Sequence, residues 1–308
     1  MIVTLTLNPA VDKSTDIERL VPEKKMRCPH MQIDAGGGGI NISKAIQELG
    51  GESIAVFPCG GTNGQVLTKL VEAEKVTARA IPIKEETREN FVVNELQTNK
   101  QFRFVMPGPS LSDEELNSIR EVIASLDEAS FLICSGSLPP NVSSDFLGEI
   151  AEIAQRRGVK FIVDTSGPPL KAALDKGVFL LKPNLTELCS LVGKEYLESS
   201  EIDDAALELI QAGSCQAIVV SMGPSGAMLV TKDIVKHFRA PAVKKQSTVG
   251  AGDSMVAGIV WMLEQNKTLE EAVRFGIACG TAATINKGTQ LFHQKDAYRF
   301  HDWMQRHG

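Results

Sequence analysis

The sequence predicts an α/β protein with a mostly parallel sheet, on three observations. Apolar stretches of strand length recur along the 308 residues, and stretches with helical periodicity separate them. The helical stretches have recognisable ends. The composition, with 43% hydrophobic and 23% charged residues, is that of a globular protein. Because the helix between two parallel strands packs on a face of the sheet, we expect an α/β body that buries its core as one large domain or two smaller ones.

The individual elements follow from short apolar stretches and from helix-end signals. The expected strands cover residues 2–7, 53–57, 131–134, 161–163, 179–181 and 217–221. The helix expected over residues 39–49 has an apolar stripe that stops at Gly50, and a capping box from Ser112 to Glu115 begins another helix. Helical segments are expected after residue 250, near 252–265, 269–285 and 295–305.

Two segments depart from this alternation. Residues 14–34 and 87–106 have the pattern of antiparallel ribbons, the second with residues 88–96 and 101–106 alternating about a turn. Strands of this kind would leave the main sheet. We therefore expect a small β-sheet, inserted in two pieces, that serves as a lid or as an oligomer interface.

Charge and cysteine usage exclude several classes of partner. The net charge is −6, which disfavours a general nucleic-acid binder or a binder of anionic membranes. No apolar stretch approaches the ~18 residues that a membrane span needs. Six scattered cysteines without a C-x-x-C pair are typical of reduced thiols, and residues 1–7 fit a first strand better than a signal peptide. The expectation is a cytoplasmic protein with no nucleic-acid or membrane partner.

Residues 248–254, with the sequence TVGAGDS, place a carboxylate behind three small residues where a helix is expected to begin. The backbone N–H groups of residues 250–252 can point at an anion, and the positive end of the helix adds to the attraction. A phosphate bound there would lie within reach of Asp253, which is where a general base for a hydroxyl nucleophile belongs. The alternative is a glycine-rich turn in which Asp253 or Ser254 caps the helix.

A second glycine cluster favours a sugar over a dinucleotide. Neither G-x-x-x-x-G-K-[ST] nor G-x-G-x-x-G occurs, so neither a P-loop nor a Rossmann site is expected. Four consecutive glycines, residues 36–39, open a helix and are followed by Asn41. Their backbone can approach a polyhydroxy ligand closely, and the Asn41 amide can donate and accept hydrogen bonds. The alternative is a flexible loop before a helix.

Three motifs together resemble those of the ribokinase-type (PfkB) carbohydrate kinases. They are Gly37-Gly38-x-x-Asn41, Asn184-Leu185-Thr186-Glu187 and Gly250-Ala251-Gly252-Asp253, in the order and spacing of that family. The resemblance runs from residue 2 to about residue 305 and is strongest to the sugar-phosphate branch, the phosphofructokinases. It implies a single domain over residues 1–308 with a ribokinase-like, doubly wound α/β fold and helices on both faces of the sheet. It also implies a small β-sheet lid, through which two subunits form a homodimer.

The resemblance assigns the chemical step to the end of the third motif. Asp253 would take the proton from the sugar hydroxyl that attacks the γ-phosphate of ATP. The amides of Gly250, Ala251 and Gly252 would form the anion hole that stabilises the transferring phosphoryl group.

The resemblance also implies ATP, Mg²⁺ and K⁺ as cofactors. Asn184 and Glu187 would hold Mg²⁺ through water, although Asn184 equally fits a helix N-cap and both roles can hold at once. ATP contacts fall on Lys182, Asn184, Glu187, Ser221, Gly223, Gly226, Lys245, Ile277 and Thr281. The potassium site falls on Ser247, Val249, Ala283, Asn286, Gly288 and Gln290. Gln290 stands where an Arg is common in relatives, which puts the dependence on a monovalent ion in doubt.

For the sugar phosphate, the resemblance separates hydroxyl ligands from phosphate ligands. The hydroxyl ligands are Asp12, Gly37, Gly38, Gly39, Asn41 and Ser137. The phosphate requires cations, and the expected lid supplies Lys25, Arg27, Arg88 and Arg103. The alternative is that basic side chains on a strand edge only discourage aggregation.

The spacing of two lid arginines leads to a hypothesis about the partner subunit. If Leu96 pairs with Gln101, Arg103 lies opposite Asn94 and six residues from Arg88, about 20 Å at ~3.3 Å per residue. One phosphate could not reach both arginines. A cation from the lid of the partner subunit is therefore expected to complete the substrate site.

The activity that the resemblance implies is ATP-dependent phosphorylation of fructose 6-phosphate at C1 to give fructose 1,6-bisphosphate. Two alternatives use related substrates, a 1-phosphofructokinase and a tagatose-6-phosphate kinase. A third alternative, from another class, is a catalytically silent sugar-phosphate sensor on the same fold. The presence of Asp253 together with Asn184 and Glu187 argues against the sensor.

Overall fold

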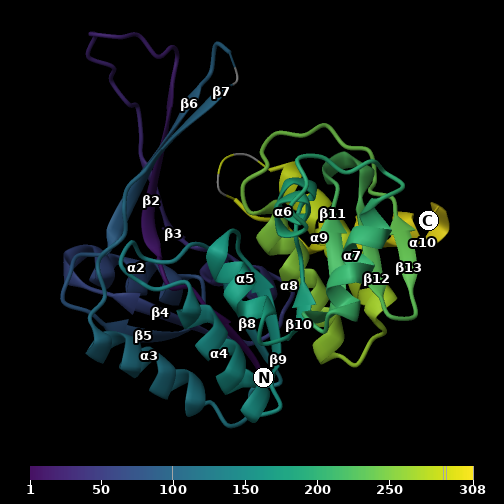
Figure 1. Cartoon of the computed structure of the whole chain (residues 1–308). Coiled ribbons are helices and arrows are strands. Elements are labelled where there is room, and N and C mark those ends of the chain that lie inside the picture. Colours follow the sequence, from purple (N-terminus) through teal and green to yellow (C-terminus); the bar gives the residue numbers. More distant parts are fainter. Residues whose placement is uncertain (99, 287, 289, 308) are drawn as a thin grey trace.

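The computed structural model describes every residue of the chain except 99, 287, 289 and 308. Its main sheet has nine strands in the order β13-β12-β11-β10-β9-β8-β1-β4-β5 (Figure 1). The strands are β1 (Ile2–Leu5), β4 (Ser53–Cys59), β5 (Thr77–Pro82), β8 (Phe131–Ser135), β9 (Lys160–Asp164), β10 (Val178–Leu181), β11 (Cys215–Ser221), β12 (Ala227–Thr231) and β13 (Val235–Phe238). Pairing is parallel from β5 to β11 and antiparallel for β12 and β13. The predicted mostly parallel sheet is confirmed.

Three strands of this sheet were absent from the sequence-based expectation. β5 is the edge strand at one end of the sheet, and β13 is the edge strand at the other end, with β12 next to it. β5 alternates exposed with partly buried residues, and three of the four residues of β13 are exposed. An edge strand buries too little apolar surface to produce the continuous hydrophobic run by which a central parallel strand is recognised.

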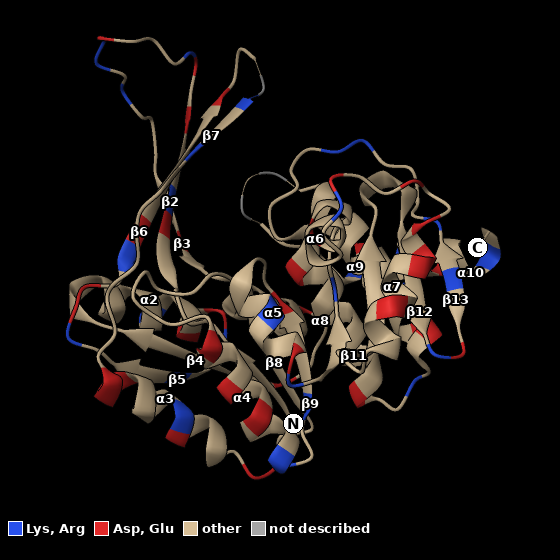
Figure 2. Cartoon of the chain, in the orientation of Figure 1, with Lys and Arg blue, Asp and Glu red and all other residues tan. Residues whose placement is uncertain are grey.

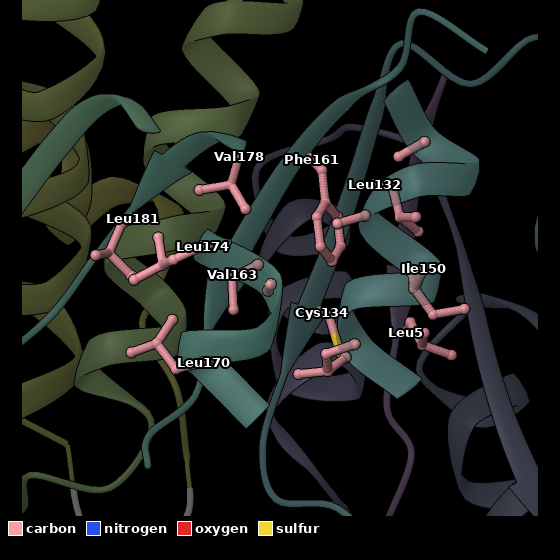
Figure 3. Close-up of a cluster of buried hydrophobic side chains, with 14 of the residues drawn as sticks. Leu5, Leu132, Cys134, Ile150, Phe161, Val163, Leu170, Leu174, Val178 and Leu181 are labelled. Atoms are coloured by element: carbon pink, nitrogen blue, oxygen red, sulfur yellow. The ribbon is translucent and has the colours of Figure 1, made fainter. Parts of the chain in front are cut away.

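Helices cover both faces of the sheet because neighbouring residues of each strand point to opposite sides. Val3 and Leu5 belong to the apolar cluster under α3, α4, α5 and α7, whereas Ile2 belongs to the cluster under α1, α8, α9 and α10. Figure 3 shows part of the first cluster, where Phe161 and Val163 of β9 lie among side chains from the covering helices. The helices are α1 (Gly38–Glu48), α2 (Gly61–Ala73), α3 (Asp113–Ala124), α4 (Asp145–Arg156), α5 (Pro168–Leu174), α6 (Leu185–Leu191), α7 (Ile202–Gln211), α8 (Ala251–Glu264), α9 (Leu269–Thr284) and α10 (Gln294–His307).

A second sheet of four strands projects from this body (Figure 1), and we call it the lid sheet. Its order is β3-β2-β6-β7, formed by β2 (Ala10–Ile17), β3 (Gln32–Gly36), β6 (Arg88–Glu95) and β7 (Lys100–Val105). The central pair β2–β6 is parallel, and both outer pairs are antiparallel. The first piece begins at Ala10, four residues before the expected start at residue 14.

The register of β6 with β7 differs from the expected one. Gln101 pairs with Asn94 and not with Leu96, so Arg103 pairs with Val92 and not with Asn94, a displacement of two positions. Arg103 therefore lies four residues from Arg88 along the ladder, on the same face of the lid sheet. The separation is about 13 Å at ~3.3 Å per residue, so the distance by itself no longer requires a cation from a partner subunit.

Candidate active site

The predicted base is in the first turn of α8. Gly250 is the N-cap of this helix with φ 69°, a left-handed conformation that favours glycine. No side-chain hydrogen bond caps the helix, and the Ser254 hydroxyl is buried without a partner among the described residues. The alternative in which Asp253 or Ser254 serves only as the cap is therefore wrong. The Ala251 amide donates a long hydrogen bond of 3.4 Å to Thr248 O. The next amides of the first turn have no carbonyl acceptor within the helix, because the helix has no residues four positions before them.

Two donors from distant parts of the chain hold the Asp253 carboxylate. Asn41 Nδ2, on α1, donates to Asp253 Oδ2 at 3.0 Å, and Ser135 Oγ, at the end of β8, donates to Oδ1 at 3.3 Å. Burial and the nearby Asp164 carboxylate raise the pKa of Asp253 to about 6, against these two hydrogen bonds and the Lys182 charge. A carboxylate with a pKa near the working pH is suited to general base catalysis.

Beside Asp253 lies a buried ion pair. Lys182 Nζ is 3.1 Å from Asp164 Oδ1, and the lysine side chain is only 6% exposed. A Cβ on Gly252 would be 3.4 Å from Lys182 Nζ, so the ammonium lies next to the start of α8. Burial opposes the charge on Lys182, but the carboxylates, Asp164 above all, raise its pKa. Lys182 is therefore a cation at the helix end where an anion would bind.

These groups meet because their strands are neighbours. Ser135, Asp164 and Lys182 lie at the carboxyl ends of β8, β9 and β10, which are adjacent in the sheet. Ligands of open α/β sheets bind outside this edge. Ser135 and Asp164 were missing from the sequence-based site. Their only signal in the sequence is a polar residue that directly follows a buried parallel strand.

The proposed magnesium ligands form the N-terminal cap of α6. Asn184 Oδ1 accepts from Glu187 N at 2.9 Å, and Glu187 Oε2 accepts from Asn184 N at 2.8 Å. The capping interpretation of Asn184 is thus confirmed, while the magnesium role stays a prediction. A carboxylate has a second oxygen and further lone pairs, so the cap does not exhaust the donor capacity of Glu187. The described residues contain no cluster of three or more His, Cys, Asp or Glu arranged to hold a metal ion.

The residues assigned to the nucleotide fall into two groups. Ser221 forms an isolated parallel β-bridge with Asn184, and the Ser221 amide donates a hydrogen bond of 2.8 Å to Pro183 O. The loop that contains Gly223 and Gly226 therefore adjoins the start of α6. On α9, Ile277 and Thr281 are both nearly buried, and Lys245 is exposed in the loop before α8. Their contacts with ATP stay predictions.

The residues assigned to potassium lie together between the end of α9 and the start of α8. Ser247 Oγ donates to Gly288 O at 2.9 Å, and Val249 N donates to Ser247 Oγ at 3.2 Å. Ala283 O accepts from Asn286 N at 3.2 Å. Gln290 Nε2 instead lies 3.3 Å from His293 Nε2. Backbone carbonyl oxygens fit a monovalent cation.

The glycine run is the end of β3 and the beginning of α1, and not a flexible loop. α1 begins at Gly38, and a Cβ there would be 2.0 Å from Ser135 Oγ. At Gly39 it would be 2.6 Å from Thr6 Oγ1, and Gly37 has φ 128°. Packing of α1 against the ends of β1 and β8 thus accounts for glycine here. The same close approach brings Asn41 to Asp253.

The assigned sugar ligands outside the glycine run lie on both sides of the lid root. Asp12, on β2, accepts a hydrogen bond of 2.8 Å from Asn90 Nδ2, and burial raises its pKa. Ser137, in the loop after β8, accepts one of 3.2 Å from Asn8 Nδ2. Asn90 and Asn8 were not anticipated as parts of the site.

The four lid cations have different environments. Lys25 and Arg27 are exposed in the loop that joins β2 to β3 and projects from the body, where Figure 2 shows several basic residues. Arg103 is exposed, and its Nε donates to Gln101 Oε1 at 2.6 Å. Arg88 is partly buried and donates to two backbone carbonyls, Asn8 O at 2.8 Å and Met106 O at 3.0 Å. Part of the Arg88 guanidinium is therefore committed to structure, and its phosphate role stays a prediction.

A mostly parallel sheet, a separate lid sheet and a buried carboxylate in the first turn of α8 define a sugar kinase with the ribokinase-like fold. The chain belongs to the pfkB family of carbohydrate kinases, whose family model matches residues 5–296. None of the helices in the described residues is long and apolar enough to span a membrane.

Phosphofructokinases of the isozyme 2 type are similar over nearly the whole chain. Identity is 41% over 306 residues with the ATP-dependent 6-phosphofructokinase isozyme 2 of Escherichia coli K12, covering 99% of each chain. It is 43% over 300 residues with the isozyme of Mycobacterium tuberculosis H37Rv, covering 97% of this chain and 88% of that one. The 1-phosphofructokinase of Bacillus subtilis is 31% identical over 297 residues, covering 96% of this chain and 97% of its own.

Solved structures show the same fold. The crystal structure of phosphofructokinase-2 from Escherichia coli in complex with potassium has a TM-score of 0.96 at 41% identity, covering 99% of both chains. The structure of that enzyme in complex with fructose-6-phosphate has a TM-score of 0.94 at 40% identity, again covering 99% of both chains.

Proposed function

We propose that this protein is an ATP-dependent 6-phosphofructokinase that transfers the γ-phosphoryl group of ATP to the C1 hydroxyl of fructose 6-phosphate. The observation that carries the proposal is the Asp253 carboxylate, which Asn41 and Ser135 hold at the start of α8 beside Lys182. Identity of 41–43% with isozyme 2 enzymes, against 31% with a 1-phosphofructokinase, favours fructose 6-phosphate over fructose 1-phosphate.

The geometry of the site supports the following chemistry. Asp253 accepts the proton of the C1 hydroxyl as its oxygen attacks the γ-phosphorus, and the bond from that phosphorus to the bridging oxygen of ADP breaks. The first-turn amides of α8 and the Lys182 ammonium stabilise the charge on the transferring group. Asn184 and Glu187 would hold Mg²⁺ through water, and the ion would neutralise phosphate charge. A potassium ion at the carbonyls near Ser247 and Ala283 would support the same loop.

The test is a substrate panel with the purified protein. ADP formation with ATP and Mg²⁺ is measured for fructose 6-phosphate, fructose 1-phosphate and tagatose 6-phosphate at matched concentrations. We expect the highest kcat/KM with fructose 6-phosphate and a product that aldolase cleaves. A higher kcat/KM with either other sugar phosphate would overturn the assignment, and the absence of turnover with all three would support a sensor.

We further propose a homodimer formed through the lid sheet. Exposed large apolar side chains gather on the lid sheet and on the loops next to its strands, and clusters of this kind mark interaction surfaces. They are Met26, Met31, Ile33, Leu96, Phe104, Val105 and Met106. The loop with Lys25 and Arg27 extends away from its own body (Figure 1), which is consistent with a cation supplied to the partner's substrate.

The dimer has its own test. Replacement of Phe104, 45% exposed on β7, by Glu should give a monomer in sedimentation velocity and raise the KM for fructose 6-phosphate. A monomeric F104E protein with unchanged KM would contradict a partner-supplied cation. A cytoplasmic location stays a prediction from the sequence.

A further inference from the structure

At the root of the lid sheet, Asn90 and Asp12 form a cross-strand pair. They are register partners in the parallel ladder of β2 with β6, so their side chains point to the same face. Asn90 Nδ2 donates to Asp12 Oδ1 at 2.8 Å. The Asp12 carboxylate, which is expected to bind a sugar hydroxyl, is therefore oriented by a residue of the neighbouring strand.

The other half of the Asn90 amide is also committed. Asn90 Oδ1 accepts a hydrogen bond from Met106 N at 3.3 Å, directly after the end of β7. Because only the oxygen of the amide can accept from an N–H, the NH₂ group is the half that must face Asp12. Arg88 donates to Met106 O at 3.0 Å, so β6 holds the Met106 backbone through both its N–H and its carbonyl.

The carboxylate that Asn90 holds lies beside the junction of the lid sheet with α1. A Cβ on Gly36, the last residue of β3, would lie 2.2 Å from Asp12 Oδ2, so this oxygen lies against the first glycine of the run that leads into α1. The same helix carries Asn41, which donates to Asp253. Asp12 thus lies in the part of the lid sheet that adjoins the helix positioning the base, where a sugar bound for phosphoryl transfer would present its hydroxyls.

We propose that Asn90 is a positioning residue that fixes the Asp12 carboxylate for the hydroxyl groups of the sugar and ties that orientation to the lid strand ending at Met106. The proposal rests on the proposed function, since it needs a sugar phosphate as substrate. Asn90 itself need not touch the sugar. Its loss should weaken sugar binding while the ATP site and the chemical groups around Asp253 stay in place.

The charges facing Asp12 define a second readout. Burial and the Asp34 carboxylate raise the pKa of Asp12, while the hydrogen bond from Asn90 and the cations Arg88 and Lys44 lower it. Removal of the Asn90 donor therefore raises this pKa further. As the pH is lowered, the KM for the sugar should therefore begin to rise at a higher pH in a variant without the donor than in the wild type. Simple loosening of the lid would not produce this change.

The experiment compares Asn90→Asp with Asn90→Ser and with the control Glu89→Gln. Asn90→Asp keeps the shape but replaces the donor by a like charge, and Asn90→Ser keeps a smaller donor. Glu89 is the adjacent residue on the opposite face, where Lys13 Nζ lies 2.7 Å from its Oε1, so Glu89→Gln weakens the same pair of strands without touching Asp12. Each protein is assayed for kcat and for both KM values between pH 6 and 9, with the thermal midpoint and sedimentation as checks of folding and assembly.

We expect Asn90→Asp to raise the KM for fructose 6-phosphate by about 10- to 100-fold, with kcat and the KM for ATP changed by less than about threefold. Asn90→Ser should lie between Asn90→Asp and the wild type, and Glu89→Gln should match the wild type. An equal effect of Glu89→Gln, or a fall in kcat in place of the rise in sugar KM, would overturn the proposal. Should Asn90→Asp fail to fold, Asn90→Ser with an unchanged sugar KM has the same consequence. Failure of the wild type to use fructose 6-phosphate would count against the proposed function alone.

Discussion

Asn41 Nδ2 and Asp253 Oδ2 are 3.0 Å apart, although 212 residues separate them in the chain. The contact joins the start of α1 to the start of α8, so the glycine run and the TVGAGDS stretch form two sides of one site. A donor held against a carboxylate favours its ionised form, and burial opposes it. For Asp253 burial is the larger effect, and the resulting pKa is about 6.

Replacement of Asp253 by Asn tests the base. The variant keeps the shape of the side chain but cannot accept the hydroxyl proton, so we expect kcat to fall by ~10²–10⁴-fold. The fold should persist. Because the pKa of Asp253 is raised in the fold, its ionised form costs stability above pH 6, and a neutral Asn removes that cost. The measurements are kcat from steady-state assays and the thermal midpoint at pH 7.5. A folded variant with wild-type kcat would contradict the assignment of Asp253 as the base.

The acid side of the pH–rate profile should report the same group. Since Asp253 must be ionised to accept a proton, kcat/KM should fall about tenfold per pH unit below a pKa near 6. Ser135 Oγ stabilises the ionised form by donating to Asp253 Oδ1, so Ser135→Ala should move this limb to higher pH. The measurement is kcat/KM between pH 5 and 8 for both proteins. An unshifted limb in Ser135→Ala would show that another group sets the profile.

The Lys182–Asp164 pair should matter for both rate and stability. Lys182→Met removes a cation next to Gly252, and we expect kcat to fall by about 10²-fold. It also leaves Asp164 without its partner, which should cost about 3 kcal/mol of unfolding free energy. The double variant Lys182→Met/Asp164→Leu should recover most of the stability but none of the rate. Urea unfolding and steady-state assays separate the two effects, and a double variant that regains activity would rule out a role for the Lys182 charge.

The buried side chain of His301 should make the free energy of unfolding depend on pH. It packs edge-on against Phe275 with ring centroids 5.2 Å apart, and its Nε2 is buried without a partner among the described residues. Burial lowers its pKa, although Asp302 and Glu271 oppose the shift and Arg274 adds to it. The unfolded chain therefore takes up this proton first, and the stability that neutral His301 contributes is present above about pH 6.5 and is lost as the pH falls below it.

The corresponding variant is His301→Leu. Its thermal midpoint should fall less steeply than that of the wild type between pH 7 and 5, while the kinetics at pH 7.5 stay unchanged because α10 is outside the site. A slope equal to that of the wild type would assign the acid sensitivity to other groups.

Sequence patterns identified the elements that bury continuous apolar surface. The central strands, the helix from the glycine run and the capping box at Ser112 follow from local periodicity and local hydrogen bonding, which the sequence shows directly. The edge strands β5 and β13 were missed because strands with so many exposed residues have no such pattern, whereas β12 was missed although its sequence, AMLVT, is a mostly buried apolar stretch. The β6–β7 register was displaced by two positions because the turn, rather than the side-chain alternation, determines it.

For the candidate site, too, some features follow from the sequence and others only from the tertiary structure. The sequence alone determined the class of reaction, because a carboxylate behind three small residues at a helix start, together with two further motifs in order, is a property of the linear chain. Tertiary structure alone decided which groups surround that carboxylate. Ser135 and Asp164 reach it only because β8 and β9 are neighbours in the sheet, and Asn90 reaches Asp12 only because β2 and β6 pair in parallel. Hydrogen bonds and charges act over a few ångströms, and folding alone determines which residues lie within that range.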